Sequence, residues 1–202
     1  MTDRYFKIFS DEKLLAAIDG YDCITLPCYD VKKLGQSTVC DQYCTLPEQE
    51  RSFWNTLIES ARMLAPEYSS AIDRLEKGAE QYLCNMFIMK KELFFRYCEF
   101  LFPILEDVEK KIDTTGFSPA KSRFLGYFGE FLLSIFCFKL REEGVCKLKQ
   151  VEGTFIVSDQ IVTHAYFKYM AYRILSKVTF GKLASYLRRK KCGTGNTGMG
   201  IN

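Results

Sequence analysis

The 202-residue sequence contains one histidine, His164, and no Asp-x-Asp motif. A single histidine cannot build a multi-histidine metal site, and it leaves little room for a nucleophile–histidine pair. The missing Asp-x-Asp removes a common carboxylate pair for a divalent ion. Nine cysteines are present, but they include no C-x-x-C pair and their number is odd. We therefore expect reduced thiols, with neither a disulfide framework nor a zinc module.

Long uncharged stretches are missing as well. The most apolar run, Phe124 to Phe138, contains Glu130, so no segment has the length expected of a membrane-spanning helix. The first residues lack the basic start and apolar middle of a signal peptide, which predicts a cytoplasmic protein. The net charge of +3 is far from the strongly basic balance of nucleic-acid-binding proteins, so we expect no nucleic-acid partner.

Aromatic residues are abundant at 15%, and hydrophobic periodicity predicts helices that alternate with a few short strands. The helices are expected over 10–20, 47–64, 65–78, 90–113 and 118–144. The strands are expected over 21–27, over 82–89 and within 146–157, with a surface loop over 30–47. The 90–113 helix, interrupted near Pro103, should be sandwiched, and the 118–144 helix should be buried. This pattern predicts an α/β layer protein.

Basic and aromatic residues are concentrated in a C-terminal tail, residues 161–191, which we expect to be helical. Its composition is typical of an anchor at a membrane surface, and equally of a solvated helix that packs on the domain. Residues 192–202 are rich in glycine and polar side chains and are expected to be disordered. Residues 1–160 then remain as the folded domain.

Two adjoining stretches carry a family resemblance. The first is YLCNMFIMKKELFFRYCEFLFPILEDVEKKID, and the second is GFSPAKSRFLGYFGEFLL, in which Arg123, Gly126 and Glu130 keep the family's spacing. Weaker similarity extends through YDCITLP and ILSKVTFGK. Together they make the chain resemble the C-terminal half of the domain-of-unknown-function 4422 family, which occurs in bacterial polysaccharide gene clusters and is regarded as a family of glycosyltransferases.

The resemblance implies a GT-A-like α/β fold, helix-rich with a small mixed sheet, in which residues 1–160 are a partial glycosyltransferase domain. It implies transfer of a sugar from a nucleotide-sugar to a glycan acceptor in capsule or lipopolysaccharide synthesis, at the inner face of the bacterial membrane. The family normally opens with a nucleotide-binding segment. We expect this chain to lack that segment, so a divalent metal cofactor would need residues outside it. The alternative is a noncatalytic sugar-binding or scaffold module that needs a separate donor-binding half.

Four residues are candidates for the site. Glu130 lies among aromatic residues on a helix expected to be buried, as the acceptor-side base or as half of a structural ion pair with Arg123 on the same face. Arg123 is also a candidate for substrate binding. Asn85 either hydrogen-bonds a sugar hydroxyl or satisfies the neighbouring backbone. Asp113 begins a polar turn, as a substrate ligand or as a cap, and no residue is assigned to a metal.

Overall fold

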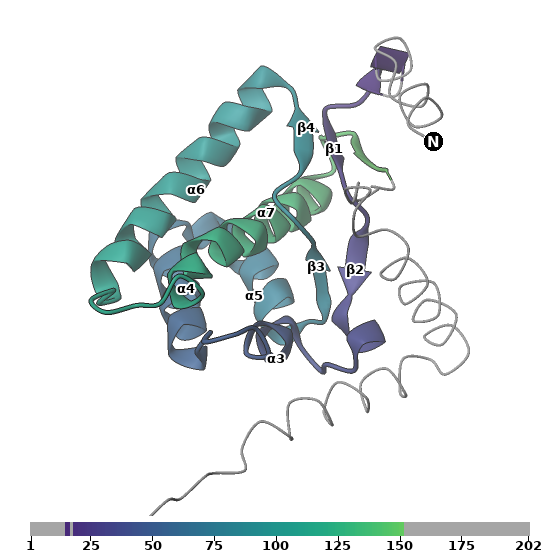
Figure 1. Ribbon diagram of the computed structural model, residues 1–202. Coiled ribbons are helices and arrows are strands. Elements are labelled where there is room, and N and C mark those ends of the chain that lie inside the picture. The colour runs from purple at the N-terminus through teal and green to yellow at the C-terminus, as the bar shows by residue number, and fades with distance from the viewer. Residues whose placement is uncertain (1–14, 17, 152–202) are drawn as a thin grey trace, which may run out of the picture.

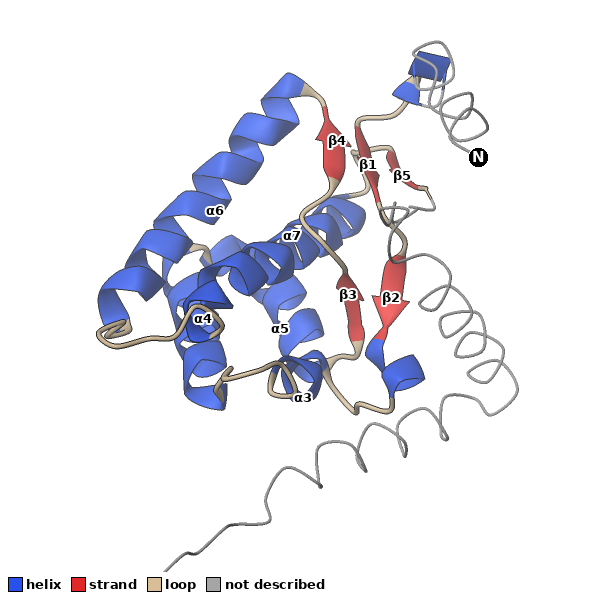
Figure 2. Ribbon diagram, viewed as in Figure 1, coloured by secondary structure: helices blue, strands red, loops and turns tan. Residues whose placement is uncertain are grey.

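The computed structural model describes residues 15–16 and 18–151. This part of the chain folds into short strands and several helices (Figures 1 and 2). The strands are β1 (Cys23–Thr25), β2 (Cys28–Asp30), β3 (Glu80–Tyr82), β4 (Phe87–Met89) and β5 (Leu148–Gln150). The α-helices are α3 (Val39–Tyr43), α4 (Arg51–Leu64), α5 (Ser69–Lys77), α6 (Lys91–Lys111) and α7 (Phe124–Glu143). Single 3-10 turns are η1 (Val31–Leu34), η2 (Pro66–Tyr68) and η3 (Lys121–Arg123). This helix-rich α/β composition confirms the predicted fold class.

Two small sheets lie beside the helices. In the first the strand order is β4-β1-β5, with β1 antiparallel to β4 and parallel to β5. In the second, β2 and β3 are antiparallel. The strand predicted over 82–89 is therefore wrong as a single element, because β3 and β4 belong to different sheets. Between them Cys84 adopts a left-handed backbone conformation with φ of 62°, which redirects the chain.

The segment 30–47 is not the surface loop that was predicted. It contains η1 and α3, and each begins at a side-chain cap. The Asp30 carboxylate accepts the Lys32 N–H at 2.9 Å, and the Thr38 hydroxyl accepts the Asp41 N–H at 3.1 Å. These caps satisfy backbone donors that a short helix otherwise leaves unpaired, so elements too short for a periodic pattern can still form.

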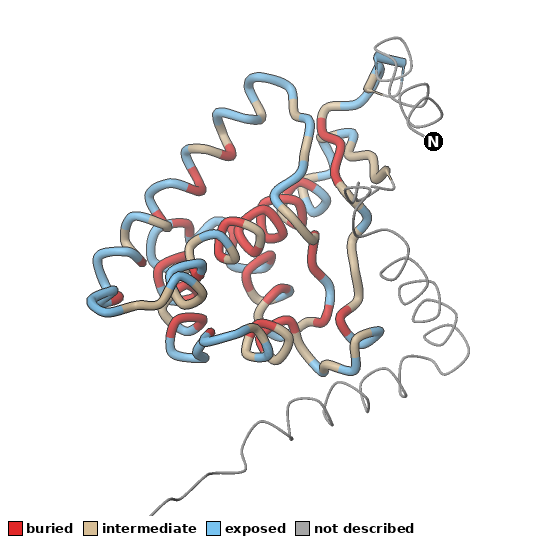
Figure 3. The backbone as a smooth tube through the Cα atoms, viewed as in Figure 1, coloured by how far each residue is buried: buried red, intermediate tan, exposed pale blue. Residues whose placement is uncertain are grey.

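Helix α7 is the centre of the core, as its apolar sequence predicts. Phe128, Leu132 and Phe136 are fully buried, and Figure 3 shows buried positions along most of the helix. Gly144 ends it in a left-handed conformation with φ of 68°. The predicted start at Ser118 is early, because α7 begins at Phe124 and the Ser118 hydroxyl accepts the Lys121 N–H in the turn that precedes it.

Helix α6 differs from its prediction in two ways. Pro103 lies inside a continuous helix of 21 residues and does not interrupt it. The helix is also not sandwiched, because Phe95 and Phe102 are exposed on its outer side. Neither α6 nor any other helix of the described residues combines the length and the hydropathy of a membrane-spanning segment. The predicted basic tail and disordered C-terminus fall outside the residues that the structure describes.

Candidate functional site

One face of α7 is covered along only half of its length. Residues three, four and seven apart share a helix face, so Arg123 at the start of α7 aligns with Gly126, Glu130, Ser134 and Cys137. The strands cover the second half of this face. The Ser134 hydroxyl accepts the Tyr82 N–H of β3 at 2.9 Å, and the thiol of Cys137 is hydrogen-bonded to that of Cys23 in β1.

The first half of the same face is open. Arg123 and Gly126 are exposed and Glu130 is half-buried. A methyl group added at Gly126 would meet no atom within 4 Å. The residues that carry the family spacing therefore share one accessible surface, which we call the α7 shelf: Arg123, Gly126 and Glu130.

Glu130 is hydrogen-bonded to the bend between β3 and β4, which lies next to the shelf. Its carboxylate accepts the Cys84 N–H at 3.0 Å. Cys84 is the residue with a positive φ, a conformation that costs energy for a residue with a Cβ, so this hydrogen bond stabilises a strained turn. A carboxylate oxygen has two lone pairs and Glu130 has two such oxygens, so the side chain keeps acceptor capacity for a ligand.

The predicted ion pair between Glu130 and Arg123 is wrong, since no ion pair joins them among the described residues. The guanidinium of Arg123 lies instead over the ring of Tyr127, 5.2 Å from its centroid. The reason is distance. Seven residues advance about 10 Å along a helix, and each side chain has a nearer partner. Arg123 thus remains at the far end of the shelf, as an exposed cation.

Asn85 follows directly in the bend and lies against α7. Its side-chain oxygen accepts the Tyr97 hydroxyl at 3.3 Å, and that hydroxyl is also 3.3 Å from the Gly129 carbonyl oxygen. Burial raises the pKa of Tyr97 well above its ordinary value, so the hydroxyl remains a donor. The amide nitrogen of Asn85 lies 2.8 Å from where a Cβ at Gly129 would be, so a larger residue at this position would require the Asn85 side chain to move.

The structure thus brings together Asn85 and Glu130, two of the candidate residues, although 45 positions separate them in the sequence. Gly129, which makes room for Asn85, was not among the predicted site residues. The available signal was a glycine in the middle of an apolar helix, a position that usually has a packing reason.

Asp113, the fourth candidate residue, lies in a turn after α6 and not at the α7 shelf. Its carboxylate accepts the Thr115 N–H at 2.9 Å, and this hydrogen bond holds the pKa of Asp113 below its usual value. The residue lines a cavity of 310 Å³ together with Ser52 and Lys121, among others. No hydrogen bond in the described residues connects it to the shelf. Asp113 is therefore a turn residue in this structure, and its role toward a substrate stays a prediction.

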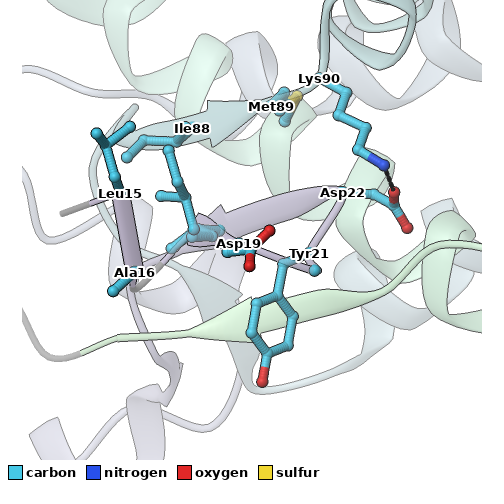
Figure 4. A pocket seen from close by; sticks show the side chains of 11 residues that line it. Leu15, Ala16, Asp19, Tyr21, Asp22, Ile88, Met89 and Lys90 are labelled. Carbon is cyan, nitrogen blue, oxygen red and sulfur yellow. Dashed lines mark ion pairs between the residues drawn. The ribbon is translucent and has the colours of Figure 1, made fainter. Parts of the chain in front are cut away.

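A larger cavity of 780 Å³ lies at the end of the first sheet (Figure 4). Asp19, Asp22 and Lys90 are the charged residues that line it, and sequence reasoning did not single out Asp22. Its carboxylate is 2.6 Å from the Lys90 ammonium and accepts the Lys147 N–H at 2.7 Å. These contacts lower the pKa of Asp22 and fasten the start of β1 to the ends of its two neighbours. No cluster of three or more metal-ligating side chains occurs within the described ranges.

Comparisons with known proteins agree with this architecture. The family model described as "Domain of unknown function (DUF4422)" matches residues 2–141. Among solved structures the chain is similar to the apo structure of WbbM, a bifunctional glycosyltransferase, with a TM-score of 0.72 and 29% sequence identity. The match covers 77% of this chain but 28% of that chain, so this chain spans little more than a quarter of the WbbM structure. A search of curated proteins finds no match.

Proposed function

This chain belongs to the DUF4422 family, and from that premise we propose that it is a sugar-binding part of a glycosyltransferase. The transferred sugar comes from a nucleotide-sugar, and the acceptor is a glycan of bacterial surface polysaccharide. The similarity to the bifunctional glycosyltransferase WbbM supports the reaction type. The observation that carries the proposal for this chain is the α7 shelf: Glu130 binds the backbone of Cys84, which directly precedes Asn85, and Arg123 is exposed at the far end.

Glu130 and Arg123 on the shelf, and Asn85 beside it, each have a role that follows from the chemistry of the side chain. The Glu130 carboxylate is half-buried and can accept the proton of an acceptor hydroxyl, the task of a general base in sugar transfer. The Asn85 amide offers both a donor and an acceptor, which suits a sugar hydroxyl. Arg123 carries a permanent charge and suits the phosphate oxygens of a nucleotide-sugar.

A second candidate is a noncatalytic sugar-binding or scaffold module that pairs with a separate donor-binding half. The share of 28% in the WbbM comparison favours this alternative, because the activity of a much larger protein need not reside in one quarter of it. In either case a divalent ion would be held by residues outside the described part of this chain.

Sugar titrations monitored by NMR, with the purified chain and a panel of nucleotide-sugars and glycans, test the proposal. We expect binding that Asn85→Ala weakens by about tenfold, the loss of one good hydrogen bond. We expect little turnover by this chain alone. Sustained turnover would exclude the noncatalytic alternative, and failure to bind any sugar or nucleotide-sugar would contradict both candidates.

Glu130→Gln separates the base from a structural residue. The amide oxygen of Gln can still accept the Cys84 N–H, so the variant should melt close to the wild-type temperature. Transfer by the complete enzyme should fall by about two orders of magnitude, the scale for a lost general base. The matched control on the same helix is Glu142→Gln, whose exposed carboxylate accepts the Ser70 hydroxyl at 3.1 Å. A Glu130→Gln enzyme that is stable and fully active would remove Glu130 from the mechanism.

The basic tail, residues 161–191, lies outside the described residues, and we propose that it holds a cytoplasmic protein at the inner face of the membrane. Eight cationic side chains and no acidic ones in this segment support attraction to anionic lipids. Co-sedimentation with vesicles tests this. Binding to phosphatidylserine vesicles that salt abolishes is expected, and equal binding to neutral vesicles would contradict it.

A further inference from the structure

Helix α6 has two apolar sides. The first faces the core and consists of buried residues: Tyr97, Phe100, Leu101, Ile104 and Val108. The second lies on the flank and consists of residues spaced three and four apart, which we call the α6 stripe: Phe95, Cys98, Phe102 and Leu105. Phe95 is 51% exposed and Phe102 is 60% exposed, while Cys98 and Leu105 are half-buried. Lys91, on the same helix, lies with its ammonium 5.8 Å from the centroid of the Phe95 ring, and both phenylalanines keep more than half of their surface exposed.

The spacing of the stripe is that of a coiled-coil seam. Apolar residues at alternating steps of three and four keep one line of a helix against a partner helix, and the stripe does so from Phe95 to Leu105, about one and a half heptads. The helix is about 31 Å long, long enough for such a contact. Figures 1 and 3 show α6 at an edge of the molecule, where a partner helix can approach its outer side.

The charges at the two ends of the stripe identify the partner. Lys91 lies four residues before Phe95, and Glu109 lies four residues after Leu105, so both continue the spacing of the stripe. Both side chains are exposed. Glu109 makes no ion pair with any described residue. If two α6 helices run antiparallel, Lys91 of each copy lies opposite Glu109 of the other. A parallel pair would place like charges together, which is unfavourable.

The same antiparallel register also matches the apolar residues. With Lys91 opposite Glu109, Phe95 lies opposite Leu105 and Cys98 lies opposite Phe102. Each contact occurs twice, as twofold symmetry requires. We propose that this chain forms a homodimer through antiparallel packing of the α6 stripes. The proposal is independent of the sugar-transfer function, because the stripe contains none of the shelf residues.

Glu99 is expected to destabilise the dimer, which provides a further test. Glu99 is exposed beside the stripe, and in this register the two copies of Glu99 lie near the twofold axis on the same side. Two carboxylates close to the twofold axis repel each other. Glu99→Gln should therefore lower the dissociation constant of the dimer by about 2- to 5-fold, the effect of one surface charge contact.

Analytical ultracentrifugation of the full chain over a range of concentrations tests the proposal. We expect a monomer–dimer equilibrium whose dissociation constant Phe102→Glu raises by at least about 100-fold, since it puts a charge in the centre of the seam. The matched control is Met63→Glu, an exposed apolar residue on α4 that is 56% accessible, and it should leave the equilibrium unchanged. Circular dichroism confirms that each variant is folded.

Charge reversal tests the register. Lys91→Glu and Glu109→Lys should each weaken the dimer by about 3- to 10-fold, and the double variant should restore it, because the opposite charges then face each other again. A wild-type chain that stays monomeric would overturn the proposal. So would a dimer that tolerates Phe102→Glu, or single reversals that the double variant does not rescue.

Discussion

Two glycines of α7 offer a matched pair of substitutions that tests how Asn85 is held. Both lie inside the same helix, where alanine is favoured over glycine by about 0.5–1 kcal/mol. At Gly126 the added methyl meets no atom within 4 Å, so Gly126→Ala should realise this gain. For a protein of this size, about 1 kcal/mol corresponds to a rise in melting temperature of about 2–4 °C.

At Gly129 the same change has a different result. The new Cβ would lie 2.8 Å from the Asn85 amide nitrogen, so the Asn85 side chain must move. Its hydrogen bond from Tyr97 is then lost, a cost of about 0.5–1.5 kcal/mol that offsets the helix gain. The Tyr97 hydroxyl retains the Gly129 carbonyl as an acceptor, so nothing buried is left unpaired. We expect Gly129→Ala to melt within about 2 °C of the wild type.

The binding assay completes the comparison. If Asn85 contacts a sugar from its position against Gly129, Gly129→Ala should weaken sugar binding by about tenfold, as Asn85→Ala does, without loss of stability. Thermal melting by circular dichroism and NMR titration on the same preparation give both quantities. A Gly129→Ala variant that gains as much stability as Gly126→Ala and binds sugar normally would refute the idea that this glycine positions Asn85.

Three further predictions concern stability. Ser134→Ala should lower the free energy of unfolding by about 1–3 kcal/mol in urea titrations, because the buried N–H of Tyr82 loses its acceptor; an unchanged midpoint would contradict this. Cys84→Gly should raise that free energy by about 1 kcal/mol by relieving the positive φ, whereas Cys84→Val should lower it. Because the contacts with Lys90 lower the pKa of Asp22 in the folded state, its stabilising effect is present above the unfolded pKa near 3.8 and is lost as the pH falls through the folded pKa. The stability difference between wild type and Asp22→Asn should therefore shrink in urea titrations below pH 4, and a difference that grows there would refute the assignment.

The sequence could predict elements that one continuous pattern defines. Helix α7 is long and apolar, ends at a glycine in a left-handed conformation, and was expected to be buried. The sequence could not predict the break between β3 and β4, because a run that is apolar except for Asn85 does not show that Cys84 turns the chain. The conformation of Cys84 depends on a hydrogen bond from 46 residues away, which no local pattern reveals.

The candidate site shows the same division. Glu130 and Asn85 could be selected because polar residues in apolar surroundings need partners. Their proximity could not be predicted, since it follows from the way the bend lies on α7. The pairing of Glu130 with Arg123 was inferred from helix periodicity alone. It was wrong because periodicity aligns two side chains without showing which partner is nearer.

The order β4-β1-β5 has a consequence for the nascent chain. The backbone of Lys147 bonds to the Asp22 carboxylate, a contact that joins residues 125 positions apart. At a synthesis rate of about 5–20 residues per second, β5 is translated about 6–25 s after β1. The helices between them are synthesised in that interval, and a helix can form early because its backbone hydrogen bonds join residues only four apart. The pairing of β1 with β5 therefore completes the first sheet only after the residues of α4 to α7 have been synthesised.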